Sequence, residues 1–321
     1  MTFGKELSNE FHKLCNVPNL GEVSLFTKLM DSFINLSNRY PMYNITFMHS
    51  HNGQVIYKNS NTENKIKRAT GVTTISGKTD DIIGVALPSP VVEFQCEISD
   101  LAFIVYSKHG VKVTYLQNKY ERIFDISKKR FHVDVDQLGL LKGRPIFKVV
   151  SPKSSIAKHA TCNILYDADI ESVGSYGVFY KDNNNYEMFY CPADLINYSP
   201  IKSDTEITRK LNSKKNKYKK RNIPVKYEGE VSKTHRYNTV YEDCMYAETI
   251  EKFGDELINF HIGTILKEKE LNKIKNFLKE RGQVKILKKI ESLGNQNQSD
   301  DDNDYVFTGA KIYIFIESNI E

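Results

Sequence analysis

Two adjacent segments between residues 91 and 119 most constrain how this chain can fold. Residues 101–106 (LAFIVY) form a continuous apolar run, and residues 111–116 (VKVTYL) alternate between apolar and polar side chains. The first pattern is typical of a strand covered on both faces, and the second of a strand with one buried face. Lys108-His109-Gly110 lies between them and predicts a turn. We therefore expect a buried sheet in an α/β or α+β fold with a mixed central sheet.

Helical periodicity predicts helices elsewhere. Residues 22–37 place apolar side chains along one face of a helix. Residues 264–293 show a second helical pattern, which Gly282 divides into two helices. Residues 134–142 predict a short helix with Asp134 as its N-cap.

Several short segments predict further strands. Asn52-Gly53 separates two β-prone runs and predicts a hairpin turn. The remaining strand candidates are residues 91–98, 162–167, 176–180, 305–307 and 312–316.

Composition predicts a soluble, cytoplasmic protein. The first residues lack the apolar stretch of a secretory signal, and no apolar run approaches the roughly 20 residues of a membrane-spanning helix. The five cysteines are scattered and form no CxxC pair, which argues against a zinc site and fits reduced thiols. The net charge of +5 permits a polyanionic partner without requiring one. The sequence contains no GxxxxGK[ST] loop, so we expect no intrinsic NTPase.

Asp100, Gln117 and Lys119 combine the groups that metal-dependent cleavage of a phosphodiester needs. Asp100 begins one predicted strand, and Gln117 and Lys119 share a face near the end of the next. If the two strands pair around the intervening turn, all three side chains meet at one end of the sheet. A carboxylate and an amide oxygen can hold Mg²⁺ or Mn²⁺, which lowers the pKa of a water molecule. An ammonium group can orient that water and offset negative charge.

This D…QxK pattern resembles the PD-(D/E)XK, or restriction-endonuclease-like, nuclease superfamily, in the variant where Gln replaces the second acid. The likeness extends over EISDLAFIVYSKHGVKVTYLQNKYER and FHVDVDQLGLLKGRPIF. Both segments are similar to a group of uncharacterised bacterial proteins in which a D-x-x-Q-x-x-LL-x-x-R-P segment follows the Q-x-K strand. The resemblance covers roughly residues 90–150.

The resemblance implies a restriction-endonuclease-like core and a role for each motif residue. Asp100 would be the principal Mg²⁺ ligand, Gln117 a second ligand through its carbonyl oxygen, and Lys119 the group that orients the attacking water. Glu97 would add a carboxylate, with Glu93 as the alternative. The implied activity is hydrolysis of DNA, with RNA as the alternative substrate, in restriction or antiphage defence. A partner ATPase or sensor subunit is also implied, and homo-oligomerisation is left open.

The chain shows its clearest change of composition at residues 209–221, which carry eight positive charges and no negative one. Six of these cations are expected to contact nucleic-acid phosphates, namely Lys214, Lys215, Lys217, Lys219, Lys220 and Arg221. A solvated, self-repelling loop is the alternative. Arg144 is a further candidate for a phosphate contact, although an Arg at a helix end also binds carbonyl groups.

The basic run suggests how the chain is organised. We expect an N-terminal helical segment at 1–40, a nuclease-like core at 41–205, a basic linker at 206–224, and a C-terminal region at 225–321 with helices and a β-hairpin for recognition or partner binding. A non-catalytic alternative remains, in which a degenerate nuclease fold binds nucleic acid or protein without cutting. Gln117, as the substitute for an acid, is where such degeneration would show.

Overall fold

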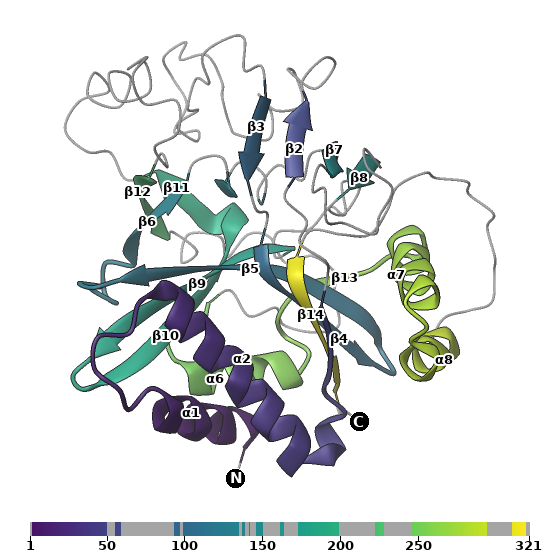
Figure 1. The fold of residues 1–321 in the computed structure, drawn as a ribbon, viewed down its shortest axis with the longest axis horizontal. Coiled ribbons are helices and arrows are strands. Elements are labelled where there is room, and N and C mark those ends of the chain that lie inside the picture. Colours follow the sequence, from purple (N-terminus) through teal and green to yellow (C-terminus); the bar gives the residue numbers. More distant parts are fainter. Residues whose placement is uncertain are drawn as a thin grey trace.

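A seven-stranded mixed sheet with helices on both faces forms the centre of the protein (Figure 1). The computed structural model describes residues 2–49, 55–58, 93–96, 99–134, 137–138, 141, 146–149, 161–163, 173–198, 222–227, 246–293 and 310–318. The expectation of an α/β fold with a mixed central sheet flanked by helices is confirmed within these ranges.

The apolar run at residues 101–106 and the alternating segment at residues 111–116 form the central pair of strands. β4 (Ser99–Ser107) and β5 (Gly110–Glu121) are antiparallel, with Ser107 opposite Gly110 and Leu101 opposite Leu116. Every residue of β4 is buried, as expected for a continuous apolar strand. The predicted hairpin is therefore confirmed, and Gln117 and Lys119 lie near the end of β5, as predicted.

The sheet continues on both sides of this pair in the order β1-β14-β4-β5-β9-β10. β14 (Ala310–Glu317) runs parallel to β4, and β9 (Gly174–Asp182) runs parallel to β5. The outer strands β1 (Thr46–His49) and β10 (Asn185–Pro192) pair antiparallel with β14 and β9. The short β13 (Thr264–Ile265) pairs with the first part of β5. The sheet therefore combines strands from both ends of the chain.

Three helices cover one face of this sheet: α1 (Phe3–Leu14), α2 (Glu22–Arg39) and α6 (Ile250–Ile258) (Figure 1). Phe103 of β4 lies between them, with ring centroids 5.3 Å from Phe33 of α2 and 5.6 Å from Phe253 of α6. The short 3₁₀ turn η1 (Pro41–Tyr43) follows α2 and leads to β1. The amphipathic helix predicted at residues 22–37 is confirmed as α2.

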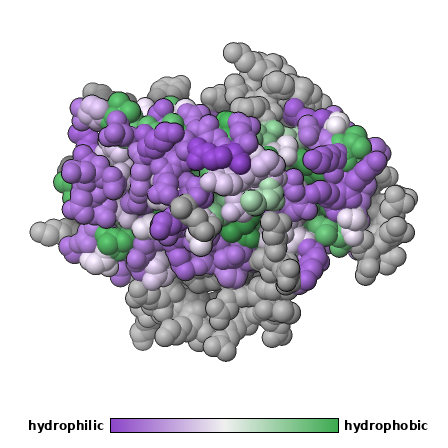
Figure 2. Space-filling view, turned by 90° about the horizontal axis from the view of Figure 1, so that it is seen from below, coloured by the Kyte–Doolittle hydropathy of each residue, from purple (hydrophilic) through white to green (hydrophobic). Residues whose placement is uncertain are grey.

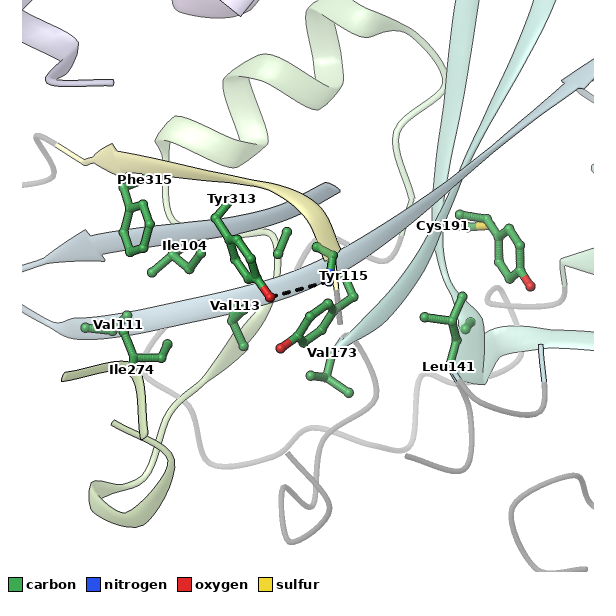
Figure 3. Packing of buried hydrophobic residues seen from close by; sticks show 14 of the residues in the cluster. Ile104, Val111, Val113, Tyr115, Leu141, Val173, Cys191, Ile274, Tyr313 and Phe315 are labelled. Atoms are coloured by element: carbon green, nitrogen blue, oxygen red, sulfur yellow. Dashed lines mark hydrogen bonds between the residues drawn. The ribbon is translucent and has the colours of Figure 1, made fainter. Parts of the chain in front are cut away.

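The opposite face packs against α7 (Glu268–Glu280), α8 (Val284–Ser292) and a small three-stranded sheet. That sheet contains β11 (Ile196–Tyr198), β12 (Asn222–Tyr227) and β6 (Arg130–Asp134), with the 3₁₀ turn η2 (Ala193–Leu195) leading into β11. Figure 3 shows Tyr313 of β14 among Ile104, Val113 and Tyr115 in this cluster. The predicted division at Gly282 is confirmed, since α7 ends at Glu280 and Gly282 has a φ of +65°.

The Asn52-Gly53 hairpin prediction is wrong. β1 pairs with β14, whereas β2 (Val55–Lys58) belongs to a separate four-stranded sheet with the order β3-β2-β7-β8. The other members are β3 (Glu93–Cys96), β7 (Ile146–Val149) and β8 (Thr161–Asn163). β1 and β2 each pair with strands that are distant in the sequence, so the turn residues between them do not determine their partners. The strand predicted at residues 305–307 lies outside the described residues.

The sequence-based division of the chain does not separate two hydrophobic cores. β14 and helices α7 and α8 come from the expected C-terminal region, yet their buried side chains share one cluster with β4, β5 and β9. β14 pairs with β1 and β4, where a C-terminal hairpin was expected. Residues before 50 and after 225 therefore complete the sheet of the expected core.

The face formed by α1, α2 and α6 is mostly hydrophilic, with hydrophobic residues in small separate patches (Figure 2). Val17, Val23, Ile34 and Met42 are among the exposed apolar side chains of this region. Isolated apolar residues of this kind are ordinary on a protein surface. Among the helices in the described ranges, none is both long and apolar enough to span a membrane.

A polar contact joins α1, α6 and β10 beneath this face. Glu187 Oε2 accepts a hydrogen bond from the Ile250 N–H at the start of α6 (3.0 Å), and Glu187 Oε1 lies 2.8 Å from His12 Nε2. The hydrogen bond with Glu187 raises the pKa of His12 above its usual value, although desolvation acts in the opposite direction. One carboxylate therefore satisfies a helix terminus and pairs with an imidazole.

We expect the closest contact between α1 and α6 to tolerate no added side chain. An alanine Cβ at Gly4 would overlap the carbonyl oxygen of Glu251 and lie 2.7 Å from Asp255 Oδ1. Gly4→Ala should therefore lower the free energy of unfolding by about 1–3 kcal/mol, measured by urea denaturation. Gly21→Ala is the control, because its Cβ would meet nothing within 4 Å. Equal losses in the two variants would contradict this packing.

The pairing of His12 with Glu187 should make stability depend on pH. Folding raises the pKa of His12, so the protonated imidazole stabilises the folded state. This stabilisation is complete below the pKa of the unfolded state, about 6.5, and is lost as the pH rises through the pKa of the folded state. His12→Gln should therefore destabilise the protein more at pH 5.5 than at pH 9, measured by denaturation at both values. A pH-independent difference would show that the imidazolium contributes nothing.

Candidate functional site

Asp100, Gln117 and Lys119 project from the same face of the central sheet. Asp100 is the second residue of β4, and continuing the Leu101–Leu116 register by one residue places it opposite Gln117. Gln117 and Lys119 follow Tyr115 at two-residue intervals, so they share the face that packs against α7, α8 and the small sheet. The structure brings together the two side chains that face each other across the hairpin, since Gln117 Nε2 donates to Asp100 Oδ2 at 2.9 Å.

Asp100 is buried, with 8% of the residue exposed, and its carboxylate receives hydrogen bonds on both oxygens. Oδ2 accepts from Gln117 Nε2 and from the Asn118 backbone N–H, each at 2.9 Å, with Asn118 Nδ2 at 3.4 Å. Oδ1 accepts from Lys311 Nζ of β14 at 3.0 Å. A buried carboxylate is costly unless it is paired and hydrogen-bonded, and these contacts meet that requirement.

Lys119 is connected to Asp100 through two amides. Lys119 Nζ donates to Gln137 Oε1 (2.8 Å), Gln137 Nε2 donates to Gln117 Oε1 (3.2 Å), and Gln117 Nε2 donates to Asp100. An ammonium group only donates and an ionised carboxylate only accepts, so the two charged ends fix the orientation of both amides. We call this series of four side chains the amide chain.

The amide chain determines what Gln117 can offer to a metal ion. In this arrangement its nitrogen faces Asp100 and its carbonyl oxygen faces Gln137, contrary to the expected direction of a metal ligand. For Gln117 to share a cation with Asp100, its amide must turn over, and the hydrogen bond from Gln137 to its oxygen is then lost. Binding of a divalent ion would therefore rearrange the amide chain.

Asp100 and Gln117 carry donors of the kinds that Mg²⁺ takes in proteins. Asp100 supplies a carboxylate and Gln117 an amide oxygen, and Mg²⁺ is commonly held by one or two carboxylates together with water and substrate phosphate. Within the described ranges, no group of three His, Cys, Asp or Glu side chains is placed to hold a metal ion. A divalent ion held by Asp100 and Gln117 would therefore need water and phosphate oxygens as its other ligands.

Gln137 is held in place by its own short helical segment. Asp134 Oδ1 accepts a hydrogen bond from the Gln137 N–H at 3.2 Å, as an N-cap does, which confirms the predicted role of Asp134. Leu141 of the same segment is buried against Val173 and Gly174, where an added Cβ would lie 2.9 Å from Leu141 Cβ. The anchored leucine and the capped first turn together fix the position of the Gln137 amide.

Gln137 and Lys311 are the members of the site that the sequence analysis did not assign. Gln137 stands in the D-x-x-Q segment, so its signal was present without a role attached. Lys311 alternates with Tyr313 and Phe315, and a lysine within an otherwise apolar strand was its only signal. Its position depends on the parallel pairing of β14 with β4, which no local pattern predicts.

The remaining candidates lie where the structure gives no account of their side chains. Glu97 and Arg144 are outside the described residues. The same holds for the proposed phosphate-binding cations Lys214, Lys215, Lys217, Lys219, Lys220 and Arg221. Glu93, the alternative acid, belongs to β3 in the separate four-stranded sheet, although its side chain is not described.

Comparison with known proteins identifies no relative. No protein-family model matches this chain, and no curated protein or solved structure shows a significant similarity to it.

Removing the middle of the amide chain should weaken the fold measurably. Gln137→Leu removes an acceptor from Lys119 and the donor to Gln117 Oε1, so we expect a loss of about 1–3 kcal/mol in the free energy of unfolding. Gln283→Leu is the control, because the Gln283 side chain makes no capping hydrogen bond at α8. An unchanged urea midpoint in Gln137→Leu would show that the amide chain adds no stability.

Proposed function

We propose that this chain is a metal-dependent nuclease that hydrolyses DNA phosphodiester bonds. The observation that carries the proposal is the hydrogen-bonded series from Lys119 through Gln137 and Gln117 to Asp100 on one sheet face. It gathers a carboxylate, two amides and an ammonium group, which suit a divalent cation and a phosphate together. The resemblance of the D…QxK pattern to PD-(D/E)XK nucleases supports the same reaction.

Each residue then has a defined task. Asp100 and Gln117 would hold Mg²⁺ or Mn²⁺, which when bound lowers the pKa of a water molecule and offsets the charge of the phosphate. The Asn118 N–H and the β4–β5 register keep the Asp100 carboxylate in place. Lys119 orients the attacking water and balances negative charge on the oxygens of the phosphate. Gln137 positions the Lys119 ammonium until substrate arrives.

The wider setting belongs to the same proposal. A restriction-endonuclease-like core would present the site to DNA, and the basic residues at 209–221 would bind its phosphates in a salt-dependent manner. The resemblance favours a cytoplasmic effector of restriction or antiphage defence that a partner ATPase or sensor subunit activates.

A second candidate function is binding of nucleic acid or protein without cleavage. Two observations favour it: Lys311 already neutralises Asp100, and an amide replaces the second acid at Gln117. A site with that charge balance can bind a phosphate through its lysines without holding a metal ion.

A plasmid-cleavage assay with the full chain in Mg²⁺, Mn²⁺ or EDTA separates the two functions. We expect cleavage in either metal, none in EDTA, and a loss of about 100-fold or more in Asp100→Asn and in Lys119→Ala. Lys128→Ala is the matched control, because that lysine pairs with Asp125 on a surface turn.

The assay also defines failure. Metal-independent cleavage, or full activity in Asp100→Asn, would refute the proposed mechanism. DNA retention in a gel-shift assay without cleavage in any metal would establish the second function.

A further inference from the structure

A lysine from a distant strand contacts Oδ1 of Asp100, the oxygen that the β5 donors do not contact. β14 runs parallel to β4 with Ala310 opposite Ser99 and Ile312 opposite Leu101, so Lys311 lies beside Asp100. Its Nζ lies 3.0 Å from Asp100 Oδ1. Among the described residues, Lys311 is the donor to Oδ1, while the groups of β5 all bind Oδ2. The two oxygens thus have separate sets of partners.

We propose that Lys311 is a built-in exchangeable cation that a divalent metal ion must displace from Asp100. This inference rests on the proposed function, because it concerns the same site. In this role Lys311 sets the metal affinity of the site. Its ammonium group neutralises the Asp100 carboxylate until a divalent cation replaces it.

The two sets of Asp100 partners differ in how readily they can leave. The Asn118 N–H belongs to the β5 backbone and is fixed by strand pairing. The Lys311 ammonium ends a flexible four-carbon stem, and its side chain is 37% exposed, against 11% for that of Asp100. Lys311 can therefore withdraw into water without breaking the sheet, whereas the Asn118 N–H stays on Oδ2.

Electrostatics favours exchange over sharing. An ammonium group and a divalent cation on the same carboxylate oxygen would repel each other over a few ångströms in a partly buried site. The divalent ion carries the larger charge and attracts the carboxylate more strongly. Metal binding therefore includes the cost of breaking the Lys311–Asp100 pair, which lowers the apparent affinity. The displaced ammonium stays on its stem near Asp100, where a substrate phosphate can pair with it.

Mn²⁺ binding to the full chain, measured by electron paramagnetic resonance of the free ion, tests this role without relying on catalysis. We expect Lys311→Met to bind Mn²⁺ at least about tenfold more tightly than wild type. Lys311→Arg should bind it more weakly, because a guanidinium group forms a stronger, bidentate pair with a carboxylate. Lys128→Met removes the same charge far from the site and should leave the affinity unchanged.

Asp100→Asn should abolish the binding that responds to Lys311. Equal Mn²⁺ affinity in wild type and Lys311→Met, or no Asp100-dependent binding in any form, would overturn the exchange. Lys311→Arg keeps the positive charge beside Asp100. If Lys311→Met does not fold, the comparison of Mn²⁺ affinity between Lys311→Arg and wild type still tests the proposal. Thermal unfolding without metal checks the fold of each variant.

The cleavage assay distinguishes this inference from the function on which it rests. If wild type cuts DNA but Lys311→Met shows unchanged Mn²⁺ affinity, hydrolysis stands and the exchange fails. If Lys311→Met binds Mn²⁺ more tightly and no form cuts DNA, the exchange stands and the proposed hydrolysis fails.

Discussion

Pairing of β4 with a different strand on each side determines which polar groups contact Asp100. The antiparallel β5 brings Gln117 and the Asn118 N–H to one oxygen of Asp100, and the parallel β14 brings Lys311 to the other. The two neighbouring strands thus supply the hydrogen-bond donors that a buried carboxylate needs. Sheet register therefore sets the hydrogen-bond geometry around Asp100.

Local pattern was sufficient for elements whose partners are close in sequence. The hairpin of β4 and β5, helix α2, the division at Gly282 and the Asp134 cap all follow from periodicity or turn chemistry over short distances. It failed where pairing is long-range. Asn52-Gly53 has the composition of a hairpin turn, yet β1 and β2 join different sheets and pair with strands far along the chain.

The candidate site divides in the same way. Asp100, Gln117 and Lys119 could be grouped from sequence because one turn joins their strands, but the partner of Lys119 could not. Gln137 reaches Lys119 only after β6 and a capped turn carry it back over the sheet, and Lys311 arrives from the far end of the described chain. Amide direction is also invisible in a sequence, since it follows from which charged group lies at each end of the amide chain.

The parallel pairing of β14 with β4 has a consequence for how the molecule assembles. The β4–β5 hairpin can form locally, whereas the contact between Asp100 and Lys311 joins residues separated by 211 positions. Contacts of such sequence separation form slowly, because loop closure must precede them. Until β14 docks, β4 is an apolar edge strand with unpaired backbone groups, which is the kind of surface that invites intermolecular association. The docking of β14 thus both completes the polar centre and covers an apolar edge of β4.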